Sequence, residues 1–193
     1  MNLPNVITVS RLFLTAGFIL FVMIETTVGH FVALFLFIIA AISDFVDGWL
    51  ARKMNLITPL GKLLDPLADK ILVSSAFIFL SAEGLCPVWV TALIISREFL
   101  VTGLRQIAIE AGQVLAADKL GKWKTVFQLT YLISGIIKLT LDKMESIESP
   151  LSHIYTLTCS PWLLPSSLVL AVALTVISGW NYVWSSRYLL RSN

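Results

Sequence analysis

Four of the 12 acidic residues of this chain lie in one stretch, DFVDGWLARKMNLITPLGKLLDPLAD, which covers residues 44–69. Asp44 and Asp47 are three residues apart, and Asp65 and Asp69 are four residues apart. Spacings of three and four place side chains on one face of a helix. Two helices joined by a short loop would therefore direct four carboxylates into one pocket.

Four neighbouring carboxylates need positive charge, because a buried charge without a partner costs several kcal/mol. Arg52, Lys62 and Lys70 would neutralise part of the cluster. Divalent cations do so better, since Mg²⁺ and Mn²⁺ prefer oxygen ligands. The stretch contains no histidine or cysteine, which argues against zinc. The pattern predicts a site for two divalent cations, Mg²⁺ or Mn²⁺, with the four aspartates as ligands; a purely structural ion-pair network is the alternative.

Small residues beside the carboxylates leave room for a ligand. Gly48 follows Asp47 directly, Gly61 precedes Asp65 by four residues, and Ala51 lies about one turn from Gly48. A missing side chain lets a ligand approach the backbone of a helix closely. A flat base or a diphosphate would therefore fit here while the metal ions hold its phosphates.

The helices that carry these residues are expected to lie in a membrane. Hydrophobic residues make up 57% of the 193 residues and charged residues 13%, with a mean hydropathy of +0.86, whereas about a quarter of an average soluble domain is charged. A membrane-spanning helix needs about 20 apolar residues, and lipid leaves no partner for unpaired backbone groups. The sequence predicts an all-α integral membrane protein, a single domain over residues 1–193, with six spans at approximately Val6–Ile24, Phe31–Leu50, Leu63–Ala82, Val88–Ile109, Gly121–Leu141 and Trp162–Trp184.

Lysine and arginine residues are distributed unequally between the two ends of these spans. With the N-terminus in the cytoplasm, only Lys138 and Lys143 fall on the opposite side, and the cytoplasmic side receives Arg52, Lys53, Lys62, Lys119, Lys122, Lys124, Arg187 and Arg191. This asymmetry follows the positive-inside rule. It predicts a multi-pass protein of the cytoplasmic (inner) membrane with both termini in the cytoplasm and the metal site at the cytoplasmic ends of the second and third helices.

Other features of the chain carry less information. The first apolar run lacks a preceding basic segment and a following cleavage site, so we expect a retained helix rather than a signal peptide. Cys86 and Cys159 do not form a metal-type pair, and two cysteines define no disulfide framework. The net charge of +2 does not indicate a nucleic-acid partner.

The acidic stretch resembles the signature of the CDP-alcohol phosphotransferases. It follows D-x-x-D-G-x-x-A-R-x8-G-x-x-x-D-x-x-x-D without a departure. The resemblance implies a six-helix membrane enzyme, usually a homodimer, in which two divalent metal ions assist the hydroxyl of an acceptor alcohol to displace CMP from a CDP-linked donor. It also implies that Asp44, Asp47, Asp65 and Asp69 surround the metal ions and that Asp69 is the general base for the acceptor hydroxyl.

The same resemblance implies a nucleotide site. Gly48 and Arg52 of the signature would belong to it, and Asn5 and Thr8 at the start of the first helix would lie over it. Asn5 and Thr8 have an alternative role at an ordinary helix start, where Pro4 and Asn5 supply the usual chemistry. The predicted donor-binding set is Asn5, Thr8, Gly48, Ala51, Arg52, Gly61 and Lys62.

A second basic group lies on the fourth and fifth predicted helices. Arg97 and Arg105 are eight residues apart and share roughly one helix face, and Lys119 and Lys124 enter the fifth helix from the cytoplasm. An arginine within a span is usually functional or paired, and guanidinium groups bind phosphate well. We predict that Arg97, Arg105, Lys119 and Lys124 bind the phosphate of the acceptor; a structural network of Arg97 with Glu98, and charge bias alone for the lysines, are the alternatives.

The acceptor is predicted from this second basic group and from a further resemblance. The segments NLPNVITVSR and ISREFLVTGLR resemble the bacterial phosphatidylglycerophosphate synthase branch of the family, and the resemblance extends to about Thr125. It implies transfer of the phosphatidyl group of CDP-diacylglycerol to sn-glycerol 3-phosphate in phospholipid biosynthesis. Inositol phosphate is a competing acceptor. A divalent-cation transporter is a hypothesis of another class, which the position of the carboxylates at one membrane face and the absence of an inverted repeat disfavour.

Overall fold

The computed structural model describes the backbone of residues 3–54, 59–110, 112, 119–144 and 160–187, and the side chains of residues 8–43, 67–109, 112, 120–144 and 160–187. These residues form helices and no strand, as predicted. The six helices are α1 (Leu3–Val22), α2 (Thr27–Met54), α3 (Pro59–Ala82), α4 (Val88–Glu110), α5 (Lys119–Asp142) and α7 (Leu163–Ser186). The all-helical prediction is therefore confirmed for the described part of the chain.

Proline and glycine mark several helix ends. Helix α3 begins at Pro59, four residues before the predicted start of its span, because proline is favoured in the first turn of a helix. It ends before Gly84, whose φ of 77° lies in the left-handed region that favours glycine. Helix α4 begins after Pro87, whose carbonyl accepts hydrogen bonds from the amides of Val90 and Thr91. These signals are local, so the sequence indicates them directly.

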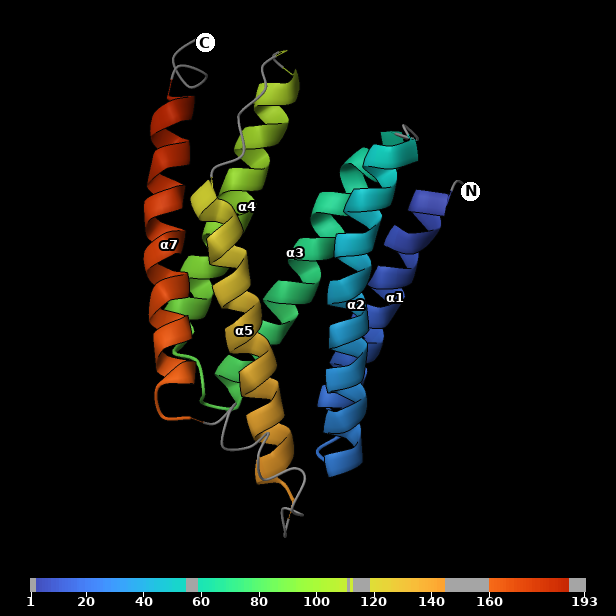
Figure 1. Cartoon of the computed structure of the whole chain (residues 1–193), viewed down its shortest axis with the longest axis vertical. Coiled ribbons are helices and arrows are strands. Elements are labelled where there is room, and N and C mark those ends of the chain that lie inside the picture. The colour runs from blue at the N-terminus through green and yellow to red at the C-terminus, as the bar shows by residue number, and fades with distance from the viewer. Residues whose placement is uncertain (1–2, 55–58, 111, 113–118, 145–159, 188–193) are drawn as a thin grey trace.

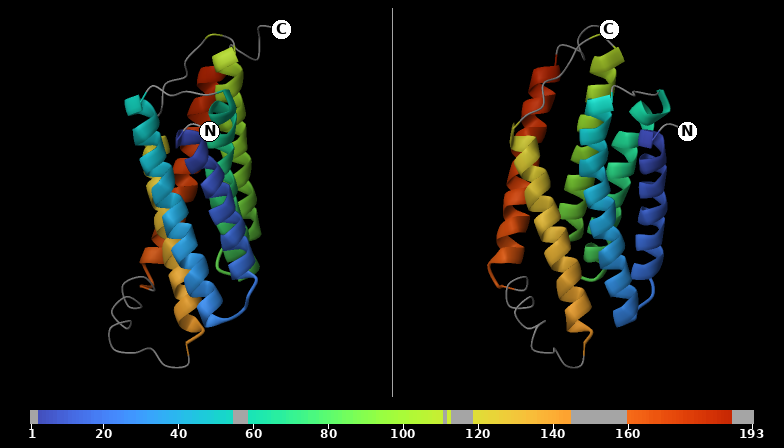
Figure 2. Two further views of the ribbon diagram at one scale, coloured as in Figure 1. Left: turned by 90° about the vertical axis from the view of Figure 1, so that its right-hand side faces the viewer. Right: turned by 45° about the vertical axis from the view of Figure 1, so that its right-hand side comes forward.

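The contacts between the helices form a ring in which each helix packs against at least two others, and Figures 1 and 2 show this bundle from the side. In order around the ring the helices are α1, α2, α5, α7, α4 and α3, and α3 also contacts α2 and α5. The start of α1 and the end of α7 lie at the same end of the bundle, together with the end of α2 and the start of α3 (Figure 1). We call this end the upper end, after its place in Figure 1.

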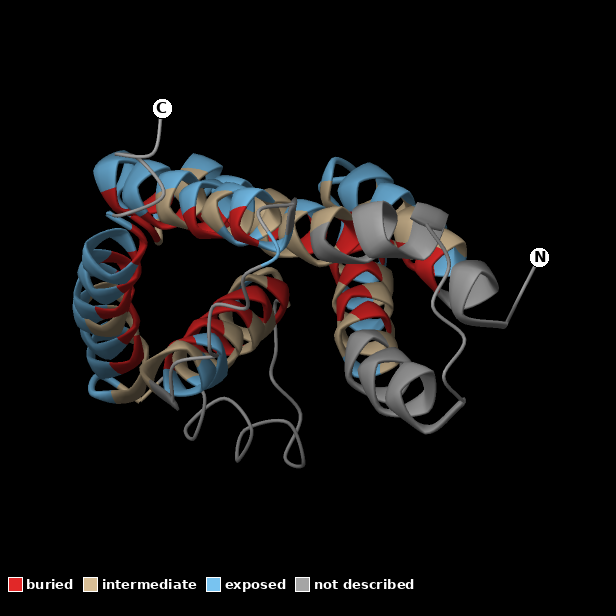
Figure 3. Cartoon of the chain, turned by 90° about the horizontal axis from the view of Figure 1, so that it is seen from above, coloured by how far each residue is buried: buried red, intermediate tan, exposed pale blue. Residues whose placement is uncertain are grey.

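Buried residues line the inside of the ring, and exposed residues cover its outside (Figure 3). The outside carries large apolar side chains, among them Trp89, Leu170 and Trp180. Among the described residues, Leu163–Ser186 is long and apolar enough to cross a membrane, and Thr8–Val22 and Thr27–Ser43 are shorter apolar helical segments. The prediction of a membrane-spanning helix thus holds clearly for α7; α4 and α5 are less apolar because they carry the charged residues described below.

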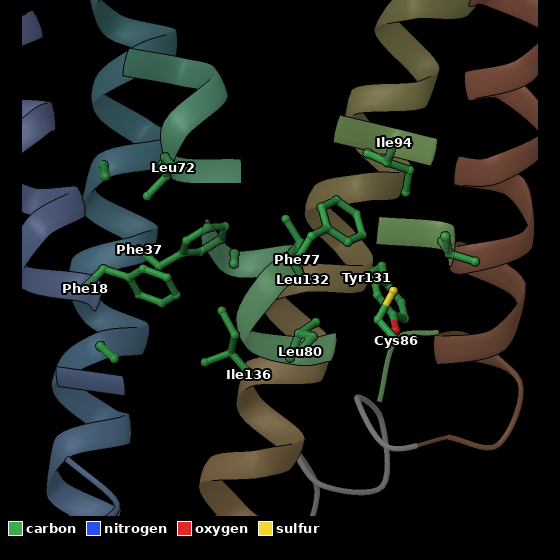
Figure 4. Close-up of a cluster of buried hydrophobic side chains, with 14 residues drawn as sticks. Phe18, Phe37, Leu72, Phe77, Leu80, Cys86, Ile94, Tyr131, Leu132 and Ile136 are labelled. Carbon is green, nitrogen blue, oxygen red and sulfur yellow. The ribbon is translucent and has the colours of Figure 1, made fainter. Parts of the chain in front are cut away.

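The apolar core lies where α1, α2, α3, α4 and α5 meet (Figure 4). The rings of Phe18 and Phe37 are 5.5 Å apart between centroids, and those of Phe77 and Tyr131 are stacked at 6.0 Å. The Tyr131 hydroxyl donates to the carbonyl of Leu85 at 3.0 Å. Cys86 is a free, buried thiol in this core, as expected for a small apolar residue; Cys159 lies outside the described residues.

Close packing of α5 on α3 depends on Gly135. A Cβ atom at this position would lie 2.7 Å from Cδ1 of Leu80, a side chain with no exposed surface. We expect Gly135→Ala to lower the free energy of unfolding by about 1–2 kcal/mol, because overpacking forces buried side chains to shift. The unfolding midpoint of the protein in detergent measures this loss.

Gly103→Ala is the matched control for this variant. Gly103 lies within α4, and a Cβ atom there would have no neighbour within 4 Å. This substitution should leave the unfolding midpoint unchanged or raise it, since alanine favours helix. Equal midpoints for the two variants would show that Gly135 does not limit the approach of the helices.

Candidate active site

A buried carboxylate on α4 joins three helices. Glu98 is 4% exposed. Its carboxylate forms ion pairs with Lys70 of α3, whose Nζ lies 3.3 Å from Oε2, and with Lys124 of α5. Nη1 of Arg97 lies 3.7 Å from Oε1 of the same carboxylate. Because a buried carboxylate is tolerated only when it is paired and hydrogen-bonded, these cations allow Glu98 to sit inside the bundle.

A pocket of about 240 Å³ lies beside Glu98, between α3, α4, α5 and α7. It is smaller than the roughly 300–1,000 Å³ of sites for drug-sized ligands, so it suits a small molecule. Five cationic side chains line it, and Glu98 is the one carboxylate among the described residues that do so; the basic residues are Lys70, Arg97, Arg105, Lys122 and Lys124. The excess of positive charge makes this a site for an anion.

Helix α7 supplies polar partners to the two arginines. Nη2 of Arg97 donates to Oγ of Ser178 at 2.8 Å, and Nη2 of Arg105 donates to the hydroxyl of Tyr182. The guanidinium carbons of Arg97 and Arg105 lie 5.9 Å and 5.2 Å from the centroid of the Tyr182 ring. Such distances fall within the range of cation–π contacts.

The sequence alone does not indicate Ser178 and Tyr182 as site residues. The signal that points to them is a stripe of small or polar residues in an otherwise apolar helix, at spacings of mostly three and four. These residues form the buried face of α7: Ser167, Ala171, Thr175, Ser178, Gly179, Tyr182 and Ser186. Small and hydroxyl-bearing residues of this kind mark the packed face of a helix in lipid. The stripe identifies a face, but it does not identify the arginines as its partners.

Asp69 lies next to the pocket. Its carboxylate pairs with Lys70, and the Nζ atom of Lys70 also contacts Glu98. Lys70 therefore links the last aspartate of the acidic stretch to the centre of the basic pocket. The side chain of Asp69 remains 29% exposed, so a ligand can reach it.

For the other three aspartates of the acidic stretch, the structure gives the position of the helix backbone only. The side chains of Asp44, Asp47 and Asp65 lie outside the described part of the chain. Their backbones belong to α2 and α3, which contact each other and have their Asp-bearing ends at the upper end of the bundle (Figure 1). Among the side chains that the structure does describe, no three potential metal ligands come together.

The predicted acceptor residues come together in part. Arg97, Arg105 and Lys124 line the same pocket, and they are joined there by Lys70 and Lys122, which the acceptor prediction did not include. The side chain of Lys119 is outside the described part of the chain. Arg97 also pairs with Glu98, which is the structural network given above as the alternative role of this arginine.

Thr8 is the one member of the predicted donor-binding set whose side chain is described. It is buried, on the inner face of α1. The side-chain positions of the remaining members lie outside the described part of the chain: Asn5, Gly48, Ala51, Arg52, Gly61 and Lys62. Their role in donor binding stays a prediction.

Comparison with known proteins identifies the family. Residues 1–177 match the model of a family described as CDP-alcohol phosphatidyltransferase. The chain belongs to this family. The resemblance predicted from the acidic signature is thereby confirmed.

Several curated relatives of this CDP-alcohol phosphatidyltransferase carry one name, CDP-diacylglycerol–glycerol-3-phosphate 3-phosphatidyltransferase. The protein of Bacillus subtilis (strain 168) is 40% identical over 193 residues, which cover 94% of this chain and 93% of the relative. That of Rickettsia typhi is 39% identical over 137 residues, covering 69% and 77%. That of Cereibacter sphaeroides is 32% identical over 207 residues, covering 94% and 93%.

Members of this family generally depend on divalent metal ions. The described part of the site fits such a group in its chemistry: Asp69 offers an accessible carboxylate at the edge of a polar pocket, and oxygen ligands suit hard cations. The three further aspartates of the signature belong to the same two helix ends. These carboxylates are therefore suitable ligands for Mg²⁺ or Mn²⁺.

Proposed function

We propose that this protein transfers the phosphatidyl group of CDP-diacylglycerol to sn-glycerol 3-phosphate and releases CMP, an early step of phosphatidylglycerol synthesis. The observation that carries the proposal is the basic pocket beside Asp69, because an acceptor that bears its own phosphate needs such a pocket next to the reacting groups. Membership of the family supports the reaction class. The name shared by the relatives supports glycerol 3-phosphate as the acceptor.

The residues of the chain divide the work of the reaction. Arg97, Arg105 and Lys124 hold the phosphate of the acceptor, which leaves one of its two free hydroxyl groups directed toward Asp69. Asp69 takes the proton of this hydroxyl. The hydroxyl oxygen then bonds to the phosphorus that carries the diacylglycerol, the bond from this phosphorus to the oxygen of CMP breaks, and CMP leaves with the electron pair.

The charge of the diphosphate donor requires a second set of groups. We infer that Asp44, Asp47, Asp65 and Asp69 hold two divalent cations, Mg²⁺ or Mn²⁺. When bound, such ions neutralise phosphate oxygens and stabilise the leaving group. The nucleotide and its diphosphate are assigned to the donor-binding set predicted from the sequence, namely Asn5, Thr8, Gly48, Ala51, Arg52, Gly61 and Lys62.

The proposed enzyme is an integral protein of the cytoplasmic membrane. The apolar outside of the ring supports six membrane spans. The start of α1 and the end of α7 both lie at the upper end of the bundle, which supports placing both termini and the active site on the cytoplasmic side. Lys138 and Lys143 lie near the opposite end of α5, as the positive-inside rule requires for this orientation. A homodimer is expected from the family resemblance.

A direct assay tests the reaction. Purified protein is incubated with CDP-diacylglycerol and radiolabelled glycerol 3-phosphate, and the lipid fraction is separated by chromatography. Labelled phosphatidylglycerophosphate should form with one CMP per lipid, should cease to form in excess chelator, and should form again when Mg²⁺ or Mn²⁺ is restored. Product from inositol phosphate alone would overturn the acceptor assignment, and full activity in chelator would overturn the metal assignment.

Arg105→Ala tests the acceptor pocket. We expect the KM for glycerol 3-phosphate to rise roughly 10- to 100-fold, because a hydrogen bond between charged groups contributes about 1.5–3 kcal/mol. The KM for CDP-diacylglycerol should stay unchanged in the same steady-state measurements. Arg187→Ala is the matched control, since Arg187 stacks on Trp184 and does not line the pocket. A rise in the KM for the donor instead would place the acceptor phosphate elsewhere.

A further inference from the structure

The two arginines of the pocket contact one aromatic ring of α7 from well-separated positions on α4. Arg97 and Arg105 are eight positions apart in the sequence, which corresponds to about 12 Å along a helix axis. Their guanidinium carbons nevertheless both lie within 6 Å of the Tyr182 ring centroid, at 5.9 Å and 5.2 Å. Both guanidinium groups therefore lie against the same side chain of α7, on the face that α4 presents to α7.

Two guanidinium groups that line one pocket repel each other, and α7 carries groups that bind them. Ser178 has no exposed surface and Tyr182 is 5% exposed, so both hydroxyls are fixed by packing. Ser178 accepts from Arg97, and Tyr182 accepts from Arg105 while its ring lies beneath both cations.

Gly179, which lies between Ser178 and Tyr182 in the sequence, also shapes the contact between α7 and Arg97. A Cβ atom on Gly179 would lie 3.1 Å from Cγ of Arg97, so the absence of a side chain lets the stem of the arginine lie against α7. Ser178, Gly179 and Tyr182 thus contact Arg97 or Arg105 from adjoining positions on one turn of the helix. Such an arrangement has a use when a ligand with two or more negative charges sits between the arginines, since that ligand offsets their repulsion.

We propose that Ser178 and Tyr182 are positioning residues that hold Arg97 and Arg105 in the geometry required for the phosphate of the acceptor, and that α7 thereby determines selectivity for a phosphorylated acceptor. This inference rests on the proposed function of the pocket.

The substitutions Tyr182→Phe and Ser178→Ala test the inference. Tyr182→Phe removes the acceptor of the Arg105 hydrogen bond and keeps the ring, and Ser178→Ala removes the acceptor of the Arg97 bond. Each should raise the KM for glycerol 3-phosphate roughly 5- to 10-fold and leave kcat and the KM for CDP-diacylglycerol unchanged. Inorganic phosphate is tested as a competitive inhibitor at fixed excess metal ion. Its inhibition constant should rise by the same factor, because phosphate would occupy the same anion site.

Two matched controls separate this role from a general loss of packing. Tyr131→Phe removes a tyrosine hydroxyl that donates to the carbonyl of Leu85, and Ser167→Ala removes a buried serine hydroxyl of α7 that donates to the carbonyl of Leu164. Neither residue lines the pocket. Both controls should keep the wild-type KM for glycerol 3-phosphate even where the unfolding midpoint falls.

The result for Arg105→Ala separates failure of this inference from failure of the proposed function. If Arg105→Ala raises the KM for glycerol 3-phosphate and the two α7 variants do not, the pocket stands and the positioning role is wrong. If none of the three raises it, the acceptor does not bind in this pocket at all. A loss of kcat without a change in KM or in phosphate inhibition would also overturn the inference.

Discussion

Asp69→Asn is expected to abolish turnover, a loss of at least roughly 10³-fold in kcat, even at saturating concentrations of Mg²⁺ or Mn²⁺. An amide binds a divalent cation poorly and does not accept a proton, so one substitution removes both functions assigned to this residue. Asparagine keeps the size of the side chain, and the partly exposed position of Asp69 tolerates a neutral group. Release of CMP and formation of labelled lipid measure the loss.

Asp142→Asn serves as the matched control for Asp69→Asn. Asp142 is also a carboxylate paired with a lysine, Lys138 at 2.7 Å, but it lies at the last residue of α5, away from the pocket. This variant should retain wild-type kcat. A substantial rate for Asp69→Asn that rises further with pH would mean that another group takes the proton of the acceptor.

The sequence predicts the helices well because the signals for them are local. Long apolar runs, Pro59 at a helix start and Gly84 at a helix end are properties of short segments, and the helices follow them. The shared helix face of Arg97 and Arg105 is also local, since it depends only on their spacing. This is why the sequence could group these two residues before any tertiary contact was known.

The contacts that complete the pocket are not local. Ser178 is 81 residues from its partner Arg97, and Tyr182 is 77 residues from Arg105. No spacing rule connects such residues, because their meeting depends on how α7 packs against α4. Lys70 is a similar case: its place directly after the acidic stretch indicates neutralisation of aspartates, whereas its contact with Glu98 requires the arrangement of α3 and α4.

Lys70 also changes the relation between the two predicted sites. In the sequence, the acidic cluster and the basic acceptor residues are separate groups on different predicted helices. In the structure, the Nζ atom of Lys70 contacts both Asp69 and Glu98. Lys70 therefore stands between Asp69, the predicted general base, and Glu98, which lines the predicted phosphate site. A small acceptor such as glycerol 3-phosphate must span this separation.

Glu98→Gln is expected to have the largest effect on stability. Glutamine preserves the volume of the side chain but removes the negative charge that faces Lys70, Lys124 and Arg97. Removal of one partner from a buried ion pair typically costs about 3–5 kcal/mol, because the remaining charges stay buried without compensation. Lys124, which is 3% exposed, has the least access to water and should contribute most to the loss. Denaturant unfolding in detergent micelles measures the change.

Two further measurements distinguish loss of charge compensation from simple misfolding. Addition of inorganic phosphate should raise the unfolding midpoint of Glu98→Gln more than that of the wild type, since an anion in the pocket replaces part of the missing charge. Lys124→Met in the Glu98→Gln background should recover part of the stability, giving a coupling energy of about 0.5–3 kcal/mol between the two sites. Glu83→Gln, at an exposed carboxylate after α3, should change neither quantity. A wild-type midpoint for Glu98→Gln would mean that the pocket lysines and arginines are balanced by other groups, and that Glu98 does not hold α3, α4 and α5 together.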